Sequence, residues 1–288
     1  MQTPETNEAV EAYFTNNPTA SQREAARDLN ITLYAVQRTL KKSLHWYPYR
    51  PKRVTVLSAE HERKRKDASN FLRLKPDAWF DNIIFSDEKW WFRRMAPNRQ
   101  NDRVYAPKGM DPHETVECRE QGGEKIMCWA GCVDGKVLQI RWMIDGNNDH
   151  ISMTGPVYAE EIIRPVWQEV RREAGHYYWQ QDGARAHTTN ANLELLQQLF
   201  PDRVISDRLE TAWPPRSPDL TPIDFWFWPR VEAVVRRQNP ETLEDLMAAV
   251  EAVAHDLDPD EIRRSCRSVK RRAQACWEAD GGHFDFAL

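Results

Sequence analysis

The stretch KIMCWAGCVDGKVLQIRWMIDG, residues 125–146, predicts two β-strands joined by a tight turn at VDGK. Apolar and aromatic residues run on both sides of a central Asp-Gly pair, and this pattern is a strong signal for a β-hairpin. A short β-rich run, residues 83–85, precedes the hairpin, whereas residues 155–175 are typical of a helix and residues 176–183 of an aromatic strand. This order of strand, hairpin, helix and strand predicts an α/β fold with a mixed sheet flanked by helices.

Length and composition favour a folded protein of a reducing compartment. The chain has 288 residues, of which 41% are hydrophobic, enough to bury the core of one large domain or two modest ones. Its five cysteines form no CxxC pair, which argues against a disulfide framework and a zinc site. No apolar run approaches the roughly 20 residues that span a bilayer, and the N-terminus lacks a signal-peptide pattern. We therefore expect a soluble intracellular protein with no membrane partner.

Charge is distributed unevenly along the chain. Residues 23–66 contain 12 Lys and Arg against 4 Asp and Glu, a balance of +8, although the whole chain has a net charge of −4. The remaining residues therefore carry −12. A basic N-terminal arm on an acidic body indicates a polyanionic partner.

Residues 19–44 predict two short helices joined by a tight turn, with residues 7–17 as a supporting first helix. Ser21 and Glu24 have the spacing of a capping box, and Thr32 can cap the second helix. The polar and basic outer face of that helix is typical of a helix-turn-helix recognition helix, although plain helical hairpins are also common. On this face the residues expected to contact DNA are Tyr34, Gln37, Arg38, Lys41 and Lys42.

The next segment, residues 45–57, reads as an extended linker because two prolines and alternating basic and aromatic residues oppose regular helix. Such a segment either follows a DNA groove and contacts phosphates or serves as a plain spacer between domains. In the first case Arg50, Lys52 and Arg53 would bind DNA.

Three aspartates lie at the borders of expected elements. Asp87 closes the first strand, Asp182 ends the aromatic strand, and Asp224 lies in the first turn of a possible helix. Together they could converge on a pair of divalent cations, because ionised aspartate supplies the hard oxygen ligands that suit Mg²⁺. Two such ions about 3.5 to 4 Å apart favour phosphodiester displacement, since they activate the attacking oxygen and stabilise the leaving one.

Each aspartate taken alone is also explained as an ordinary cap or surface residue. Asp219 competes with Asp224 in the proline-rich segment WPPRSPDLTPIDFWFW, residues 213–228. We expect Asp219 to act as a turn or cap residue that binds nearby backbone N–H groups. Pro229 lacks an N–H group and should kink the following helix or restart it there.

Four segments together resemble the mariner superfamily of DNA transposases. The three catalytic blocks of that family are similar, in the right order, to FSDEKWWF (85–92), QQDGARAH (180–187) and the proline-rich segment, and CWEADGGHFD (276–285) is similar to its ending. The resemblance covers about residues 20–287 and implies a ribonuclease H-like fold. Carried over by residue, it makes Asp87, Asp182 and Asp224 the catalytic residues and the ligands of Mg²⁺, for which Mn²⁺ can substitute.

The resemblance also sets the expected organisation and partners. A small all-α helix-turn-helix domain over residues 1–44 would precede a basic linker and connecting helix over 45–78 and a catalytic domain over 79–288. It implies a homodimer that binds double-stranded transposon ends and target DNA. Nuclear localisation follows from the family, with RPKR (50–53) and RKRK (63–66) as support. Family members usually have two helix-turn-helix units, whereas one is found in this sequence.

Three further points stay open at the level of sequence. Glu88 and His187 would support the aspartates by orienting carboxylates or contacting phosphate. The basic face of a second amphipathic helix, residues 261–277, either packs with its charges in solvent or contacts DNA. The expected activity is cut-and-paste DNA transposition; the alternatives are a domesticated, catalytically retired DNA-binding protein and a structure-selective nuclease of the same fold.

Overall fold

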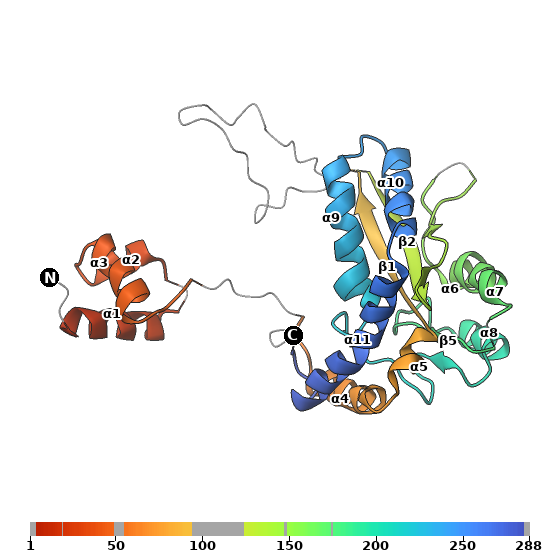
Figure 1. The fold of residues 1–288 in the computed structure, drawn as a ribbon, viewed down its shortest axis with the longest axis horizontal. Helices are drawn as coiled ribbons and strands as arrows, with labels where there is room; N and C mark the ends of the chain where they lie inside the picture. The colour runs from red at the N-terminus through yellow and green to blue at the C-terminus, as the bar shows by residue number, and fades with distance from the viewer. Residues whose placement is uncertain are drawn as a thin grey trace. The chain divides into compact units, whose positions relative to one another are not determined.

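The computed structural model describes residues 4–18, 20–48, 55–93, 124–146, 149–173 and 175–284. The chain divides into two compact units, Met1–Val54 and Thr55–Leu288 (Figure 1). The predicted DNA contacts Arg50, Lys52 and Arg53 lie outside the described residues.

The first unit is a bundle of three helices. They are α1 (Pro4–Asn16), α2 (Gln22–Asp28) and α3 (Leu33–Arg38), the last continued by the π-helical turn η1 (Thr39–Ser43). Each helix contributes one fully buried side chain to a common core: Val10, Ala25 and Val36.

The predicted helix starts in this unit are confirmed. The Ser21 hydroxyl accepts from the Glu24 backbone N–H at 3.2 Å, and the Glu24 carboxylate accepts from the Ser21 N–H at 2.7 Å. The Thr32 hydroxyl likewise accepts from the N–H of Ala35. With these apolar positions turned inward, the exposed residues of α3 and η1 are the predicted DNA contacts Tyr34, Gln37, Arg38, Lys41 and Lys42, together with Ser43.

The second unit is built on a six-stranded mixed sheet in the order β3-β2-β1-β5-β6, with β4 also paired to β2. The strands are β1 (Ile83–Phe92), β2 (Lys125–Val133), β3 (Lys136–Val137), β4 (Arg141–Trp142), β5 (Tyr178–Gln180) and β6 (Val204–Ile205). Strand β1 runs antiparallel to β2 and parallel to β5, and β5 runs parallel to β6. The predicted mixed sheet is therefore confirmed.

The predicted hairpin is present, with Asp134 and Gly135 in its turn at φ values of 48° and 73°. Its second strand is broken into β3 and β4, which is a difference from the prediction. The register shifts by one residue between them, because β3 pairs Val137 with Cys132 whereas β4 pairs Trp142 with Cys128. One extra residue in the second strand is a β-bulge, and it explains the interruption.

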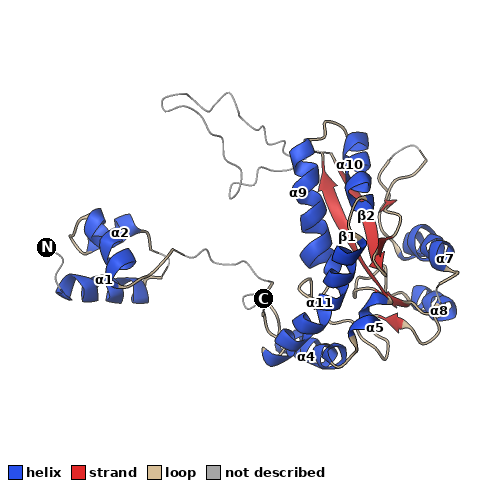
Figure 2. Cartoon of the chain, viewed as in Figure 1, coloured by secondary structure: helices blue, strands red, loops and turns tan. Residues whose placement is uncertain are grey.

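Helices cover both faces of the sheet (Figure 2). In chain order they are α4 (Ala59–Arg73), α5 (Asp77–Asp81), α6 (Gly155–Val157), η3 (Tyr158–Ile163), α7 (Arg164–Val170), α8 (Asn190–Leu199), η4 (Ile223–Phe227), α9 (Trp228–Gln238), α10 (Leu243–His255) and α11 (Pro259–Glu278). One core joins the sheet to α4, α5 and the helices from η4 to α11, and the other joins it to η3, α7 and α8. The second unit is thus an α/β/α sandwich.

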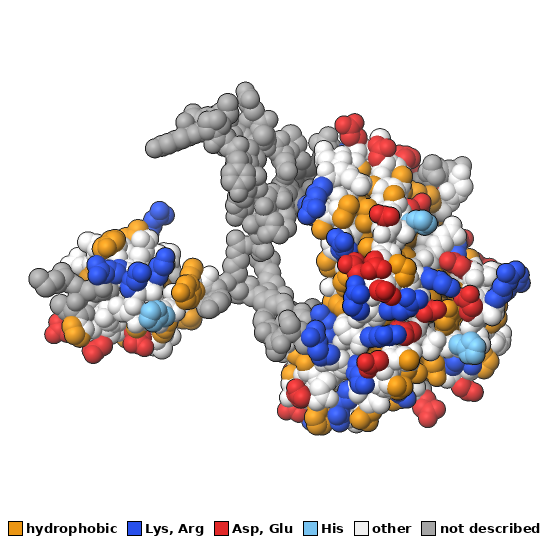
Figure 3. All heavy atoms as spheres, viewed as in Figure 1, with side chains coloured by type: hydrophobic (Ala, Val, Ile, Leu, Met, Phe, Trp, Pro, Cys, Tyr) orange, Lys and Arg blue, Asp and Glu red, His pale blue; other side chains and the backbone are white. Residues whose placement is uncertain are grey.

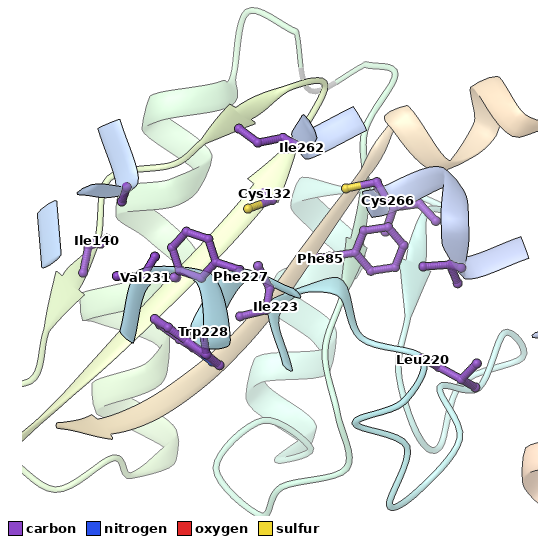
Figure 4. Packing of buried hydrophobic residues seen from close by; sticks show 14 of the residues in the cluster. Phe85, Cys132, Ile140, Leu220, Ile223, Phe227, Trp228, Val231, Ile262 and Cys266 are labelled. Atoms are coloured by element: carbon purple, nitrogen blue, oxygen red, sulfur yellow. The ribbon is translucent and has the colours of Figure 1, made fainter. Parts of the chain in front are cut away.

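The larger core shows how segments remote in sequence pack on the sheet. Phe85 of β1 and Cys132 of β2 lie in one cluster with Phe227 of η4 and Cys266 of α11 (Figure 4). Helix α4, expected as part of a connector, packs along α11 and belongs to this unit. Among the described residues, no helix is long and apolar enough to cross a bilayer.

Candidate active site

Asp87 lies inside strand β1 and not at its end, which corrects the prediction. Strand β1 continues to Phe92 because it pairs with β2 from Phe85 onward. Its parallel pairing with β5, however, is confined to Ile83 and Ile84. Asp87 therefore lies just beyond the point where the parallel pairing of β1 with β5 ends. Its backbone is held by the antiparallel pairing of β1 with β2 on the other side.

Asp182 follows the end of β5 by two residues and reaches the same edge of the sheet. The N–H of Gln181 still bonds to the carbonyl of Ile205, so the ladder extends almost to the aspartate. The chain then turns, and the N–H of Ala184 donates to Asp182 Oδ1 at 3.0 Å.

Asp224 is carried by η4, in the first turn after Pro222, as predicted. Its backbone N–H bonds to the carbonyl of Thr221 at 2.9 Å. The π-helical turn gives way to α9 at Trp228, and Pro229 stands in the first turn of α9. Because proline has no N–H group, the helix restarts at this point, which confirms the expectation for Pro229.

The electrostatics join these carboxylates into one acidic cluster. Burial, together with the charges of Asp224 and Glu88, raises the pKa of Asp87 well above its usual value. Burial also raises the pKa of Asp224 to about 6, and the nearby charge of Asp182 adds to the increase. A hydrogen bond from Asp87 and the charge of Lys89 oppose that increase. The structure thus brings the three predicted aspartates together.

Asp182 differs from the other two because a histidine neutralises it. Burial acts to raise the pKa of Asp182, but the His187 hydrogen bond and charge, together with the Ala184 N–H, bring it below the usual value. Burial disfavours the charged form of His187, yet Glu88 and Asp182 raise the pKa of this imidazole to about 10. At neutral pH the His187 ring is therefore a cation between two carboxylates.

The geometry decides between the two supporting roles considered for His187. Its Nδ1 lies 2.7 Å from Asp182 Oδ1, and its Nε2 lies 3.3 Å from Glu88 Oε1. The ring stacks on Tyr158 at a centroid distance of 4.2 Å, and the residue is only 3% exposed. A ring so enclosed orients the carboxylates and does not present itself to a phosphate.

A buried glutamine behind the site has no counterpart in the sequence prediction. Gln181 Oε1 accepts from the Tyr158 hydroxyl at 3.0 Å and from Trp179 Nε1 at 3.1 Å. Its Nε2 donates to the carbonyl of His187 and to the hydroxyl of Ser206. In the sequence, Gln181 appears only as a polar residue at the end of an aromatic strand. Its hydrogen-bond partners could not be predicted from it, because Tyr158, His187 and Ser206 come from separate segments.

Asp219 lies in a turn, as predicted, but its carboxylate binds a distant arginine and not the expected nearby backbone N–H groups. Its two carboxylate oxygens accept from the guanidinium of Arg65 at 2.8 and 2.6 Å. Arg65 is fully buried and also donates to Ser217 and to the carbonyls of Arg216, Gly281 and Gly282. This arginine comes from the RKRK run, so that run is not a continuous exposed basic motif.

The basic face of α11 is largely occupied by ion pairs within the second unit. Arg267 binds Asp81 at 2.6 Å and Lys270 binds Asp77 at 2.9 Å, so both residues fasten α11 to α5. Acidic and basic side chains alternate closely over this part of the surface (Figure 3). The arrangement favours the packing interpretation of this helix.

Oxygen donors dominate the site, and their chemistry suits a hard divalent cation. In the part of the chain that the structure describes, no set of three or more His, Cys, Asp or Glu is already arranged as a metal site. The donor set nevertheless fits Mg²⁺, because burial and repulsion from neighbouring carboxylates, Asp224 and Glu88 for Asp87 and Asp182 and Glu88 for Asp224, raise the pKa values of these two aspartates. A cation between these carboxylates would relieve that repulsion.

The chain is similar to known proteins in sequence and in structure. No protein-family model matches the chain. It is 27% identical over 262 residues to the Tcb2 transposable-element transposase of Caenorhabditis briggsae, covering 88% of this chain and 86% of that protein. It is 25% identical to the Tc3 transposase of Caenorhabditis elegans, with 75% and 61% covered. It also matches 40% of the human histone-lysine N-methyltransferase SETMAR, at 22% identity over 97% of this chain.

Solved structures share the fold. A Mos1 transposase paired-end complex with the left transposon end superposes with a TM-score of 0.79 at 20% identity, covering 99% of this chain and 82% of that chain. The catalytic domain of Mos1 mariner transposase superposes with a TM-score of 0.60 at 18% identity, covering 81% of this chain and all of that chain. These likenesses confirm the predicted ribonuclease H-like fold.

Proposed function

We propose that this chain, which belongs to the mariner superfamily of transposases, is a DNA transposase that moves a transposon by cut and paste. One observation carries the proposal: Asp87, Asp182 and Asp224 come from three separate elements, and the charge of Asp224 acts on Asp87 while that of Asp182 acts on Asp224. Burying carboxylates together costs stability unless a cation or proton compensates. Such a cost is typical of a functional site.

The reaction uses two kinds of phosphoryl transfer at one site, hydrolysis of the DNA strands at the transposon end and transfer of the freed end to target DNA. In the first, a water oxygen attacks a phosphodiester at the transposon end, the bond to the 3′ oxygen breaks, and a 3′-hydroxyl and a 5′-phosphate result. In the second, that 3′-hydroxyl attacks a phosphodiester of target DNA, loses its proton, and releases a target 3′-hydroxyl. The same geometry serves both steps, because each is an in-line displacement at phosphorus.

The three aspartates would hold the divalent cations. Mg²⁺, or Mn²⁺ in its place, would supply Lewis-acid stabilisation of the charge that develops on the phosphate oxygens. The protein contributes the placement: β1 fixes Asp87, the end of β5 fixes Asp182, and η4 fixes Asp224. The charge of Lys89, which forms an ion pair of 3.0 Å with Glu232, lowers the pKa of Asp224 and so partly offsets the burial of that carboxylate.

The first unit would recognise the transposon ends. Arg38, Lys41 and Lys42 are exposed on the second helix of a helix-turn-helix pair and its π-helical continuation, and this is the helix that enters the major groove in such motifs. We further propose that the chain acts in the nucleus as a homodimer, because two transposon ends have to be joined in one reaction.

The first experiment is cleavage of a labelled duplex that carries the terminal inverted repeat flanking the gene, with Mg²⁺ or Mn²⁺. Asp182→Asn should bind this duplex and leave it uncut. Asp67→Asn, which changes an exposed carboxylate on α4, is the matched control and should cut like the natural protein. Cleavage by Asp182→Asn at the natural rate would refute the proposed site.

A second candidate is a DNA-binding protein of the same fold that does not cut. The partial match to a histone-lysine N-methyltransferase favours it, because the homologous region then occurs outside proteins named as transposases. The presence of all three aspartates argues against this second candidate, because a protein that does not cut DNA need not retain three carboxylates at this site. Specific binding without cleavage under either metal would support this second candidate.

A further inference from the structure

Two ring nitrogens contact the two aspartates that lie on or beside the sheet. Trp228 Nε1 donates to Asp87 Oδ2 at 2.9 Å, and His187 Nδ1 lies 2.7 Å from Asp182 Oδ1. Both rings are enclosed, with Trp228 4% and His187 3% exposed. In each carboxylate, therefore, one oxygen is held by the nitrogen of a buried ring, and the surrounding core restricts rotation of that ring.

Trp228 connects the strand to the helix that carries the third aspartate. It is the first residue of α9, directly after the η4 turn that contains Asp224. Its indole packs edge-on against Trp91 of β1, with centroids 6.1 Å apart, and lies beside Phe227 in the core (Figure 4). The hydrogen bond to Asp87 thus joins strand β1 to the helix that directly follows the turn carrying Asp224.

His187 performs the corresponding task at the end of β5. Both its Nδ1 and the N–H of Ala184 contact the same oxygen of Asp182, Oδ1. The side chain of Asp182 is nevertheless 55% exposed, so these two contacts do not close it off from solvent. Glu88, 3.3 Å from Nε2, and the stacked ring of Tyr158 keep the imidazole in this orientation.

We propose that Trp228 and His187 are positioning residues that fix one oxygen of Asp87 and of Asp182 and so direct the opposite oxygen of each carboxylate to the divalent cation. Mg²⁺ demands a near-ideal octahedral geometry, and a carboxylate already held in one rotamer loses less freedom on binding it. The inference rests on the proposed function, because it assumes that these aspartates bind the cation.

The test measures Mn²⁺ binding to the full chain by the loss of the free-Mn²⁺ electron paramagnetic resonance signal, without DNA. Trp228→Phe keeps an aromatic ring in the core and removes the N–H donor. It should weaken Mn²⁺ binding about tenfold or more, the usual effect of losing a partner behind a metal ligand. Trp91→Phe, which removes an equally buried indole of the same aromatic pair, is the matched control and should bind Mn²⁺ within about threefold of the natural protein.

A pair of substitutions at His187 separates its two contacts. The amide nitrogen of His187→Asn can replace Nδ1 beside Asp182, whereas that of His187→Gln can replace Nε2 beside Glu88. We expect His187→Asn to retain Mn²⁺ affinity and His187→Gln to lose about tenfold. A general packing defect would weaken both alike, and thermal unfolding without metal, recorded for every variant, identifies such a defect.

The outcomes distinguish this inference from the proposed function. If the natural protein binds Mn²⁺ and cuts DNA while Trp228→Phe and His187→Gln bind Mn²⁺ unchanged, the inference fails and the proposed function stands. Equal losses in His187→Asn and His187→Gln would also overturn the role of His187. If the natural protein neither binds Mn²⁺ nor cuts, both fail together.

Discussion

The acidic cluster makes a quantitative prediction about stability, which Asp224→Asn tests. Burial raises the pKa of Asp224 from an ordinary value of 3.8 to about 6 in the folded protein. A carboxyl whose folded-state pKa is raised contributes stability that is fully present below its unfolded pKa. That stability is lost as the pH rises through the folded pKa, because only the unfolded chain then ionises freely. Asparagine cannot ionise and should remove the penalty.

The magnitude follows from the two pKa values. A difference of about 2 between the folded and unfolded states corresponds to about 3 kcal/mol in the free energy of unfolding. Asp224 is only partly buried, so solvent screening reduces this value and we expect about 2–3 kcal/mol. For a domain of this size, such a change raises the midpoint of thermal unfolding by about 4–12 °C.

The assay compares urea unfolding of the natural protein and Asp224→Asn between pH 4 and pH 8 in the presence of EDTA. Tryptophan fluorescence reports on the second unit, which contains 11 of the 12 tryptophans. The advantage of the variant should grow between pH 4 and about pH 6.5 and then stay constant. A constant difference over the whole range would refute the reasoning, because the effect would then not come from ionisation of Asp224.

Three further predictions concern the same unit and its partner domain. Arg65→Met should lower the free energy of unfolding by about 3–5 kcal/mol, because it leaves the Asp219 carboxylate without its cationic partner. In urea unfolding, the double variant Arg65→Met/Asp219→Asn should recover part of that loss. Mg²⁺ should raise the thermal midpoint of the natural protein at pH 7.5 but have little effect on Asp182→Asn; equal shifts in calorimetry would contradict the proposed site. Replacing Arg38 and Lys41 together by alanine should weaken binding to the transposon-end duplex. Fluorescence anisotropy at several salt concentrations should show that the slope of log affinity against log salt falls by about 2 in magnitude. An unchanged slope would count against phosphate contacts from this helix.

Local signals in the sequence were sufficient for the elements but not for their exact ends. The Ser21–Glu24 spacing and the Asp-Gly pair at Asp134 each specify a local hydrogen-bond pattern, and both appear as predicted. Strand β1 was predicted too short. The reason is that Asp87 and Glu88 look like the end of a buried run, whereas pairing with β2, about 40 residues later, extends the strand through them.

Contacts between side chains of distant segments could not be predicted from the sequence, for a different reason. Asp219 was expected to bind backbone N–H groups near it, and that choice is reasonable for an aspartate after a proline. Its actual partner, Arg65, lies more than 150 residues earlier and in a run of four basic residues that looks solvent-exposed. Which of the four is buried depends on how α4 packs against α11, and no local pattern encodes that packing.

The site itself combines residues that local sequence predicts with residues that only packing brings into place. The aspartates could be identified because their segments resemble catalytic blocks, but the N–H donors that orient them come from packing. Trp228 would be an ordinary core residue if β1 did not bring Asp87 to within 2.9 Å of its indole nitrogen. His187 would be an ordinary turn residue without Glu88 on its other side. A chain that retained the three aspartates but lost these two rings would keep the sequence signature, and we expect it to bind Mn²⁺ at least tenfold more weakly. The signature therefore identifies the ligands, whereas their affinity depends on buried neighbours that only the fold brings into contact.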